Sequence, residues 1–362
     1  MSDEIYIKEC IELAKLGQGK VSPNPLVGAV VLSENNEIAG KGYHEKYGEA
    51  HAEINALNQA GERAKNGTLY VNLEPCSHFG KTPPCADRII KSGIKKLVVG
   101  MIDPNPLVSG LGLKKIRESG IEVKEGVLEK ECKKLNEIFI KYIIEQQPFI
   151  AIKTATTIDG KIATKIKSSK WITSEAARAE VQSLRNKYDA ILTGSGTIIS
   201  DNPGLICKNQ KSYRNPIRVI IDSQLRTPPN SKVYENNNTR VIVASSVDIS
   251  SNKTKIYPEN VEIIKCPLTK DKKINLNYLI DKLYQYKIAS ILIEAGGKLN
   301  GAFIKNNLVD KFYFFIAPKI LGDNEAYSMI EGFNIKDIKE SLNLKFEEVK
   351  RFSPDIMIEG YL

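Results

Sequence analysis

The sequence predicts an α/β protein of two domains, and three observations support this fold class. The chain has 362 residues, more than one domain of ordinary size needs. Short apolar runs of strand length alternate with helical patterns through both halves. A polar stretch ending in a proline, Gln146-Gln147-Pro148, follows a long helical pattern and precedes a new apolar run. We therefore place the two domains at residues 1–146 and 148–362.

The first domain begins with apolar residues at helical spacing, which predict a helix over 5–16. The apolar run 27–32 predicts a buried strand, and 37–44 its hairpin partner. The elements expected after this hairpin are helices at 52–60, 85–93, 111–119 and 129–144, and strands at 68–73, 96–101 and 122–126. Pro84 suits the start of the helix 85–93 and Gly93 its end. Helices alternating with strands favour largely parallel pairing.

The second domain repeats this alternation. Its expected strands lie at 148–157, 189–194, 217–222, 240–245, 261–265, 288–294, 310–317, 344–351 and 355–362, and its helices at 174–187, 274–286 and 298–306. The polar, Asn-, Ser- and Lys-rich stretch 246–275 predicts exposed loops.

Composition excludes several classes of protein. With 42% hydrophobic and 26% charged residues, the chain is neither disordered nor a coiled coil. No apolar run approaches the ~18 residues that span a bilayer, and the N-terminus lacks the pattern of a signal peptide. Six cysteines are too few for a disulfide scaffold, so we expect a cytoplasmic protein whose Cys10, Cys132, Cys207 and Cys266 are small apolar side chains.

The net charge of +9 lies wholly in the second domain. Through residue 147 the chain has 20 basic and 20 acidic residues, so the whole excess follows that point. Such an excess favours a polyanionic ligand, and the alternative is a lysine-rich surface without a ligand. No run of five basic residues occurs, which disfavours nucleic acid.

Histidines and cysteines form the strongest chemical pattern. The only three histidines, His44, His51 and His78, lie within 35 residues. His51, Cys76 and Cys85 would make a three-ligand zinc set with a fourth position open. Glu53 is close enough to serve as the non-ligand acid/base that zinc deaminases need. The eight residues between the cysteines exceed the usual two, so a structural zinc site or two core cysteines beside a core histidine remain alternatives.

Several longer motifs resemble one family, the bifunctional riboflavin-biosynthesis deaminase/reductases. They are PNPLVGAVV (23–31), GYH (42–44), HAE (51–53), EPCSHFGKTPPC (74–85), DPNPLVSG (103–110), KTATTIDGKIA (153–163), SKWITS (169–174), LRNKYDAILTG (184–194), TIISDNP (197–203), IDS (221–223) and EAGG (294–297). The resemblance implies a cytidine-deaminase-like first domain and a dihydrofolate-reductase-like second domain. It also implies two reactions on a phosphorylated pyrimidine: hydrolytic loss of an amino group, then NADPH-dependent reduction of ribosyl to ribityl.

The resemblance assigns roles in the first domain. His51, Cys76 and Cys85 become zinc ligands, and Glu53 the general acid/base. The implied contacts to the pyrimidine and its ribose phosphate are Asn24, His44, Ser77, His78, Asp103 and Asn105. For His44 the alternative is a role in the hairpin, and for Asp103 and Asn105 a role in a turn.

In the second domain the resemblance assigns two groups of residues. The NADP contacts are Ala155, Trp171, Thr197, Asp201, Ser223 and residues 296–302, which include Gly296 and Gly297. The substrate contacts are Ser169, Arg185, Leu205, Lys208 and Glu294. Lys153 and Asp159 are expected in the same cleft. Lys208 departs from the arginine of many relatives, which keeps the charge but loses the guanidinium fork.

Two patterns in this domain also have plainer explanations. EAGGKLNG (294–301) follows a strand and opens a helix, so its N–H groups could hold a phosphate. The alternative is a tight turn, and for Trp171 the alternative is a core position. GLGLKK (110–115), which lies in the first domain, lacks the third glycine of a dinucleotide fingerprint.

Two rival functions are less consistent with the sequence. A nucleic-acid base deaminase would need basic charge around the zinc half, which is neutral. A zinc-stabilised RNA-binding protein would need basic runs and more than 7% aromatic residues. We therefore expect zinc and NADPH as cofactors, phosphorylated pyrimidine substrates, a homo-oligomer, and no nucleic-acid or membrane partner.

Overall fold

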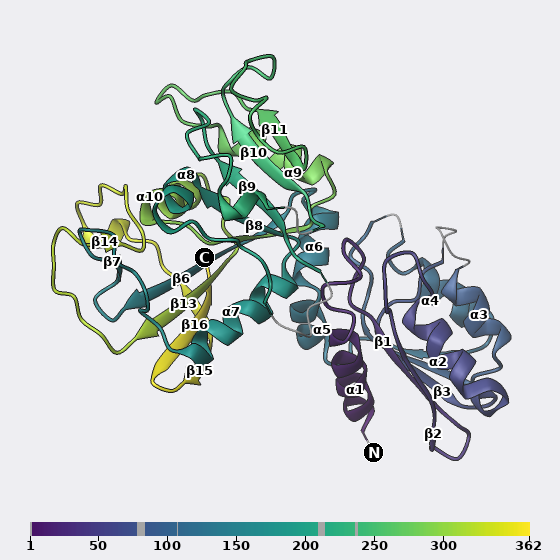
Figure 1. Ribbon diagram of the computed structural model, residues 1–362. Coiled ribbons are helices and arrows are strands. Elements are labelled where there is room, and N and C mark those ends of the chain that lie inside the picture. The colour runs from purple at the N-terminus through teal and green to yellow at the C-terminus, as the bar shows by residue number, and fades with distance from the viewer. Residues whose placement is uncertain (1, 78–83, 107, 209–213, 236–237) are drawn as a thin grey trace. The chain divides into compact units, whose positions relative to one another are not determined.

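The chain divides into two compact units, Met1–Gln147 and Pro148–Leu362, in a computed structural model (Figure 1). The structure describes residues 2–77, 84–106, 108–208, 214–235 and 238–362. Within these ranges no helix is long and apolar enough to cross a membrane. Each unit has its own sheet and its own buried core.

The first unit contains a five-stranded sheet in the order β2-β1-β3-β4-β5. Its strands are β1 (Gly28–Leu32), β2 (Ile38–Tyr43), β3 (Thr68–Leu73), β4 (Lys96–Met101) and β5 (Glu122–Lys124). β1 is antiparallel to both β2 and β3, whereas β3, β4 and β5 are parallel. The expected hairpin of β1 and β2 is confirmed, whereas the expectation of parallel pairing is wrong for β1 and β3. The tight hairpin reverses the chain, and the helix after β2 then returns it so that β3 runs in the direction of β2.

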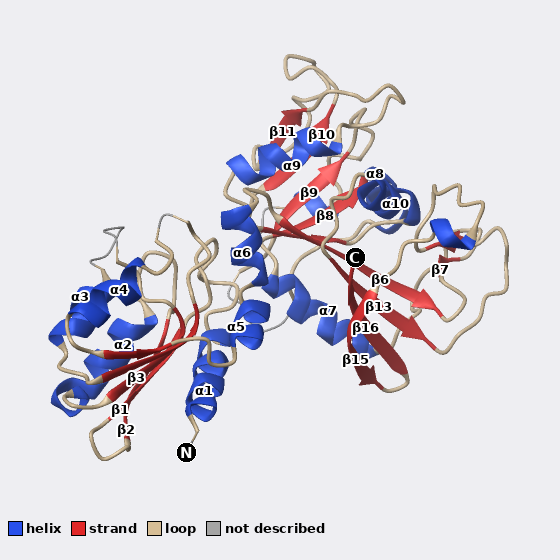
Figure 2. Ribbon diagram, turned by 180° about the vertical axis from the view of Figure 1, so that it is seen from behind, coloured by secondary structure: helices blue, strands red, loops and turns tan. Residues whose placement is uncertain are grey.

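Helices cover both faces of this sheet. They are α1 (Asp3–Lys15), α2 (Ala52–Ala60), α3 (Cys85–Lys91), α4 (Leu111–Glu118), α5 (Glu129–Leu135) and α6 (Glu137–Ile144), with a 3₁₀ turn at Gly61–Ala64. α2, α3 and α4 lie on one face and α1 and α5 on the other (Figures 1 and 2). Every residue of β1 is buried, which suits a strand covered on both sides.

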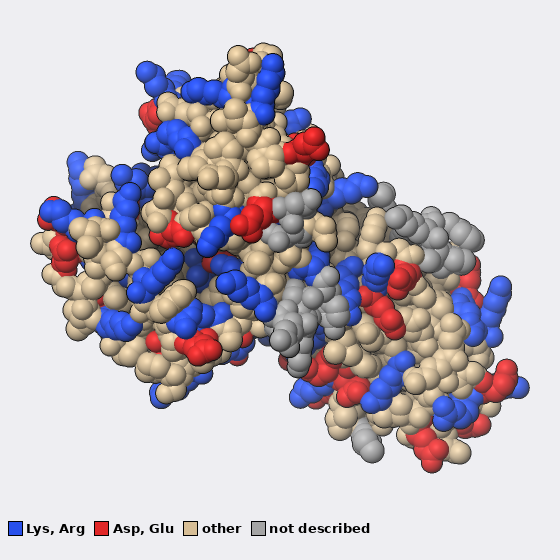
Figure 3. Space-filling model, in the orientation of Figure 1, with Lys and Arg blue, Asp and Glu red and all other residues tan. Residues whose placement is uncertain are grey.

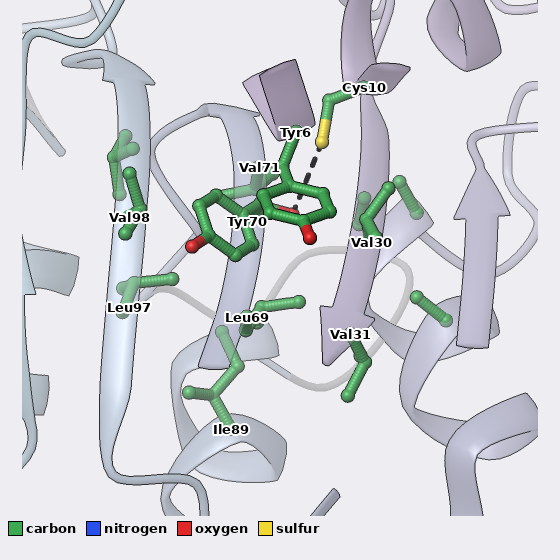
Figure 4. Close-up of a cluster of buried hydrophobic side chains, with 14 of the residues drawn as sticks. Tyr6, Cys10, Val30, Val31, Leu69, Tyr70, Val71, Ile89, Leu97 and Val98 are labelled. Carbon is green, nitrogen blue, oxygen red and sulfur yellow. Dashed lines mark hydrogen bonds between the residues drawn. The ribbon is translucent and has the colours of Figure 1, made fainter. Parts of the chain in front are cut away.

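The contact between α1 and the sheet shows how the core is closed (Figure 4). The ring of Tyr6 in α1 packs against that of Tyr70 in β3, with ring centroids 4.8 Å apart and the planes tilted by 39°. Cys10, one turn further along α1, donates its thiol hydrogen to the Tyr70 carbonyl oxygen at 3.4 Å. Cys10 is fully buried, in agreement with its expected role as a small core side chain.

A single helix was expected over 129–144, but the helix is interrupted at Asn136. The Asn136 side chain accepts the Leu26 N–H at 2.8 Å and donates to the Leu26 carbonyl at 3.0 Å. Asn72 of β3 donates to the same carbonyl at 3.0 Å and accepts the Gly28 N–H at 2.8 Å. Two buried amides thus fix the segment that leads into β1. These partners lie far away in the sequence, so helical spacing alone could not reveal the break.

The second unit contains a nine-stranded sheet in the order β11-β10-β9-β8-β12-β6-β13-β16-β15. Its strands are β6 (Phe149–Thr157), β8 (Ala190–Gly194), β9 (Ile217–Ile221), β10 (Val241–Ser245), β11 (Val261–Lys265), β12 (Ser290–Ile293), β13 (Lys311–Ala317), β15 (Lys345–Phe352) and β16 (Asp355–Tyr361). The strands from β11 to β13 are parallel, and β16 and β15 complete the sheet in antiparallel fashion.

Four α-helices pack around this sheet: α7 (Glu175–Lys187), α8 (Ser195–Asp201), α9 (Leu276–Gln285) and α10 (Gly297–Lys305). Alternate residues of one strand enter different cores. Leu192 of β8 packs with α9 and α10, whereas Ile191 packs with Ile198 of α8. Because strand side chains alternate between faces, α8 covers the face opposite to α9 and α10.

Five short elements in the described part of the second unit were not expected from the sequence. They are α8, the ribbon strands β7 (Lys161–Ala163) and β14 (Tyr327–Ser328), and the 3₁₀ turns at Lys232–Tyr234 and Ile338–Glu340. α8 has the sequence SGTIISD, whose glycine, serine and β-branched residues disfavour a helix. The ribbon pairs segments about 165 residues apart, so no local pattern predicts it. Basic side chains are prominent on the face of the second unit that Figure 3 shows, as its charge excess predicts.

Candidate active sites

The three proposed metal ligands meet at the ends of three elements of the first unit. His51 immediately precedes α2, Cys76 follows the end of β3, and Cys85 is the first residue of α3. His51 Nδ1 lies 3.2 Å from Cys85 Sγ and 3.6 Å from Cys76 Sγ. All three ligand atoms lie within 4.8 Å of one another. The eight-residue spacing between the cysteines is therefore compatible with a compact site.

The electrostatics of this cluster fit a divalent cation. The adjoining Cys85 thiol and His51 imidazole lower the pKa of Cys76, although its burial acts in the opposite direction. The backbone N–H of Cys85, at the start of α3, also donates to Cys76 Sγ at 3.3 Å. Ionisation of Cys76 together with burial raises the pKa of Cys85. A cation of charge 2+ would stabilise both thiolates at once, and two thiolates with one imidazole are typical zinc ligands.

Glu53 lies one residue inside α2 and is 3% exposed. Burial raises its pKa to about 6, although the neighbouring His51 opposes the shift. Its Oε2 atom is buried without a hydrogen-bond partner in the described part of the chain. A carboxyl group in that state is suited to pass protons to a bound molecule.

Asn24 and His44 contact each other, and His44 lies next to His51 of the metal cluster. The Asn24 amide nitrogen lies 3.2 Å from His44 Nε2, and His44 Nδ1 lies 3.2 Å from the Ala50 carbonyl oxygen. The carbonyl can only accept, so Nδ1 carries the proton, and burial lowers the pKa of His44. Its ring meets the His51 ring edge-on at 5.2 Å. Both nitrogens of His44 are thus engaged by the protein itself.

The remaining expected substrate contacts of the first unit lie on two loops. Ser77 is half-buried beside Cys76, and His78 lies outside the described residues. Asp103 Oδ1 accepts the Asn105 N–H at 2.9 Å, which is the turn that the alternative reading expected. Glu74, to which the sequence assigned no role, accepts the Asp103 N–H through Oε2 at 3.1 Å. The only local signal for it is a carboxylate directly after a buried strand.

In the second unit, Lys153, Arg185 and Glu294 form one charged cluster. Arg185 donates from Nε and a terminal nitrogen to both Glu294 oxygens, at 2.7 and 3.0 Å. Lys153 Nζ lies 3.4 Å from Glu294 Oε2. Burial alone would raise the pKa of Glu294, but Arg185 and Lys153 lower it to about 2. The cluster therefore holds two cations and one anion, a net positive charge that suits an anionic ligand.

The expected cofactor contacts other than Trp171 lie at the carboxyl edge of four neighbouring parallel strands. They are Ala155 in β6, Thr197 and Asp201 in α8 after β8, Ser223 after β9, and Gly296 and Gly297 after β12. β9, β8, β12 and β6 are consecutive in the sheet. Ligands of open parallel sheets bind outside this edge. The fold thus brings together residues that are up to 142 positions apart.

The two glycines before α10 differ in their surroundings. A Cβ on Gly297 would lie 2.2 Å from the Ser328 carbonyl oxygen, so this glycine permits close packing of the chain. A Cβ on Gly296, the N-cap of α10, would meet nothing within 4 Å. The alternative of a tight turn therefore accounts for Gly297. It does not account for Gly296, where open space beside the N-terminus of α10 is compatible with a bound anion.

Trp171 is 63% exposed, so the alternative of a core position is wrong. The Arg178 guanidinium lies 4.5 Å above its ring. Leu205 is 4% exposed and packs in the core with Ile198, so its side chain is not available to a substrate and only its backbone could make that contact. Asp159 is exposed and accepts the Gly322 N–H at 2.8 Å.

Two further expected substrate contacts lie at the surface. Ser169 is half-buried, two residues before Trp171. Lys208 is exposed, and its backbone N–H donates to the Gln182 side chain at 2.8 Å. The same segment meets the charged cluster, because Arg185 also donates to the Ile206 carbonyl at 3.0 Å.

Both units match known families. Residues 1–101 match the cytidine and deoxycytidylate deaminase zinc-binding region, and residues 148–358 match the RibD C-terminal domain. Riboflavin biosynthesis protein RibD of Aquifex aeolicus is 42% identical over 356 residues, covering 98% of this chain and 97% of that protein. The corresponding protein of Actinobacillus pleuropneumoniae is 41% identical over 360 residues, with coverages of 99% and 95%.

A solved structure gives the same answer for the fold. It is a diaminohydroxyphosphoribosylaminopyrimidine deaminase/5-amino-6-(5-phosphoribosylamino)uracil reductase from Thermotoga maritima. It matches with a TM-score of 0.89 and 40% identity, covering 99% of this chain and 98% of that one. The two-part α/β fold and the family resemblance expected from the sequence are confirmed. The chain belongs to the RibD family, the bifunctional deaminase/reductases of riboflavin biosynthesis.

Proposed function

We propose that the first unit removes the 2-amino group of 2,5-diamino-6-(5-phosphoribosylamino)pyrimidin-4(3H)-one and that the second unit reduces the ribosyl group of the resulting uracil. The observation that carries the proposal is the cluster of His51, Cys76 and Cys85 with a buried, unpartnered Glu53 oxygen beside it. His51, Cys76 and Cys85 would hold a zinc ion, which would act as a Lewis acid toward water.

The deamination needs a group that moves protons. Glu53 accepts a proton from the attacking water and delivers it to the ring nitrogen. It then takes the proton of the newly added hydroxyl and passes it to the amino group, which leaves as ammonia while the carbonyl forms. Its burial and its open oxygen support this role. Asn24, held at 3.2 Å by His44, and the Asp103–Asn105 turn are the groups we assign to orienting the pyrimidine and its ribose phosphate. Ser77 and His78 belong to the same assignment.

The reduction needs alignment and exclusion of water more than acid/base chemistry. NADPH supplies the hydride. We assign Ala155, Thr197, Asp201, Ser223, Gly296 and Gly297 to the cofactor because of their common sheet edge. Trp171 is assigned to the cofactor from the family resemblance and its exposed ring. Lys153, Arg185 and Glu294, with Ser169, Lys208 and the Leu205 backbone, are assigned to the substrate. The net positive charge of the cluster and the excess of basic residues in this unit support binding of two phosphorylated ligands.

The test separates the two reactions. The full chain, given the phosphorylated diaminopyrimidine and NADPH, should release ammonia and oxidise NADPH. A fragment of residues 1–147 should release ammonia and leave NADPH unchanged. The two sites would not be independent if the fragment were soluble and retained zinc but released no ammonia, while the full chain did. A homo-oligomer and a cytoplasmic location remain predictions from the sequence, which sedimentation and cell fractionation would check.

A further inference from the structure

Glu74 connects the strand that carries Cys76 to the loop after the neighbouring strand. It directly follows β3 and lies two residues before Cys76. Its backbone N–H donates to the Met101 carbonyl at the end of β4, at 2.9 Å. β3 and β4 are parallel neighbours, so their carboxyl ends meet at the same edge of the sheet. Glu74 therefore lies between the metal cluster and the loop that holds Asp103 and Asn105.

The Glu74 carboxylate binds that loop through four backbone N–H groups. Oε2 accepts from Asp103 at 3.1 Å and from Gly110 at 2.9 Å. Oε1 accepts from Gly112 at 3.0 Å and from Leu113 at 3.4 Å. The last two N–H groups belong to the first turn of α4, whose amides have no partner within the helix. Glu74 thus closes the loop at its start and at its end, and it caps α4 from outside.

The close fit is built into the backbone of α4. A Cβ on Gly112 would lie 2.2 Å from the Pro75 carbonyl oxygen and 3.2 Å from Glu74 Oε1. Gly110, the N-cap, has a φ of +75°, a conformation that favours glycine. Glu74 is 5% exposed, and no lysine or arginine of the described residues pairs with it. Its charge is therefore balanced by amide dipoles and the N-terminus of α4.

We propose that Glu74 is a positioning residue for deamination, one that holds the loop of Asp103 and Asn105 at a fixed place relative to Cys76. It does not touch the metal or the reacting atoms. Its effect passes through the Asp103 N–H to the turn in which Asp103 accepts from Asn105. This inference rests on the proposed function, in which the loop of Asp103 and Asn105 binds the pyrimidine or its ribose phosphate.

Glutamine is the informative replacement, because it has the same shape but only one acceptor oxygen. Each Glu74 oxygen faces two N–H donors, so an amide nitrogen at either position would oppose two donors. Glu74→Gln should raise KM for the phosphorylated diaminopyrimidine about tenfold, the effect of losing one charge-assisted hydrogen bond, with a smaller change in kcat. Zinc content and NADPH oxidation with the deaminated substrate should stay at the wild-type level.

The matched control is Glu118→Gln, the same change on the exposed face of α4, where Glu118 pairs with Lys114. It should leave KM unchanged. Glu74→Asp keeps the charge but is shorter, so a KM between those of wild type and Glu74→Gln is expected. An unchanged KM in Glu74→Gln would overturn the positioning role. Loss of zinc from Glu74→Gln would also overturn it, because the substitution would then act on the metal site.

A second measurement does not depend on any variant. In the wild-type chain, the amides of Asp103, Gly110, Gly112 and Leu113 should exchange slowly with deuterated water, unlike ordinary loop and first-turn amides. Fast exchange at these four amides would overturn the proposal even if Glu74→Gln failed to fold. If the wild type itself released no ammonia, the proposed function would fail. If the wild type were active and Glu74→Gln had the same KM, only the positioning role of Glu74 would fail.

Discussion

His51 Nδ1 lies 3.2 Å from Cys85 Sγ, although 34 residues separate them in the chain. This contact joins the start of α2 to the start of α3, and Cys76 completes the set from the end of β3. A zinc ion held by these three side chains would have a fourth position for water or substrate, as catalytic zinc sites do.

Cys85→Ser should lower the zinc content from about one ion per chain to well below that, and ammonia release should fall with it, because a serine hydroxyl is a poor zinc ligand. Metal analysis of the purified protein measures the first effect and an ammonia assay the second. Cys207→Ser, which changes a cysteine of the second unit, is the control and should keep its zinc. Full zinc occupancy in Cys85→Ser would refute the ligand assignment.

Glu53→Gln should keep zinc and lose ammonia release by ~10²–10⁴-fold, the usual effect of removing a general acid/base. The amide fills the same buried space but cannot carry the proton between water, ring nitrogen and leaving amine. Single-turnover ammonia release on zinc-loaded protein measures it, and Glu49→Gln, on the exposed loop before α2, is the control. A turnover rate equal to that of the wild type would show that another group moves the proton.

Glu294→Gln should destabilise the second unit at neutral pH by ~3–5 kcal/mol, because Arg185 and Lys153 lose their buried partner. The folded-state pKa of Glu294, about 2, lies below its ordinary value of 4.5. Its stabilising contribution is therefore complete above about pH 4.5 and is lost as the pH falls toward 2.

Calorimetry of the ligand-free full chain measures this pH dependence. The difference in melting temperature between wild type and Glu294→Gln should be largest near neutral pH and should shrink as the pH falls below about 4.5. Glu325→Gln, which removes an exposed carboxylate paired with Lys165, is the control and should have little effect at any pH. A difference that does not change with pH would contradict the ionised state of Glu294.

Ser223→Asp should lower kcat/KM for NADPH about tenfold and that for NADH less, because a carboxylate would repel the 2′-phosphate. The neighbouring Asp222 does not already do so. It is fully buried, and its Oδ2 accepts the backbone N–H and the hydroxyl of Thr227, both at 2.8 Å. Its carboxylate is therefore held within the protein by Thr227.

Steady-state kinetics with both cofactors test the assignment of Ser223. Asn252→Asp adds the same charge at an exposed position of the second unit and should leave the preference for NADPH unchanged. Equal losses with NADPH and NADH in Ser223→Asp would remove Ser223 from the phosphate site.

The sequence by itself determined the elements and the type of chemistry. Apolar runs and helical spacing are local properties, so they indicated the strands and helices near the metal cluster, such as β3, α2 and α3. Histidine, cysteine and glutamate in the pattern of residues 51–85 are chemically rare enough to indicate zinc and a proton carrier before any geometry is known.

Only the tertiary structure decided how these parts face one another. The Arg185–Glu294 and Lys153–Glu294 contacts span 109 and 141 residues, and the four partners of Glu74 lie 29 to 39 residues away. Such contacts depend on strand order, on direction and on close backbone approach. Sequence periodicity does not encode these, because it reports which face of an element is apolar and not which neighbour covers it.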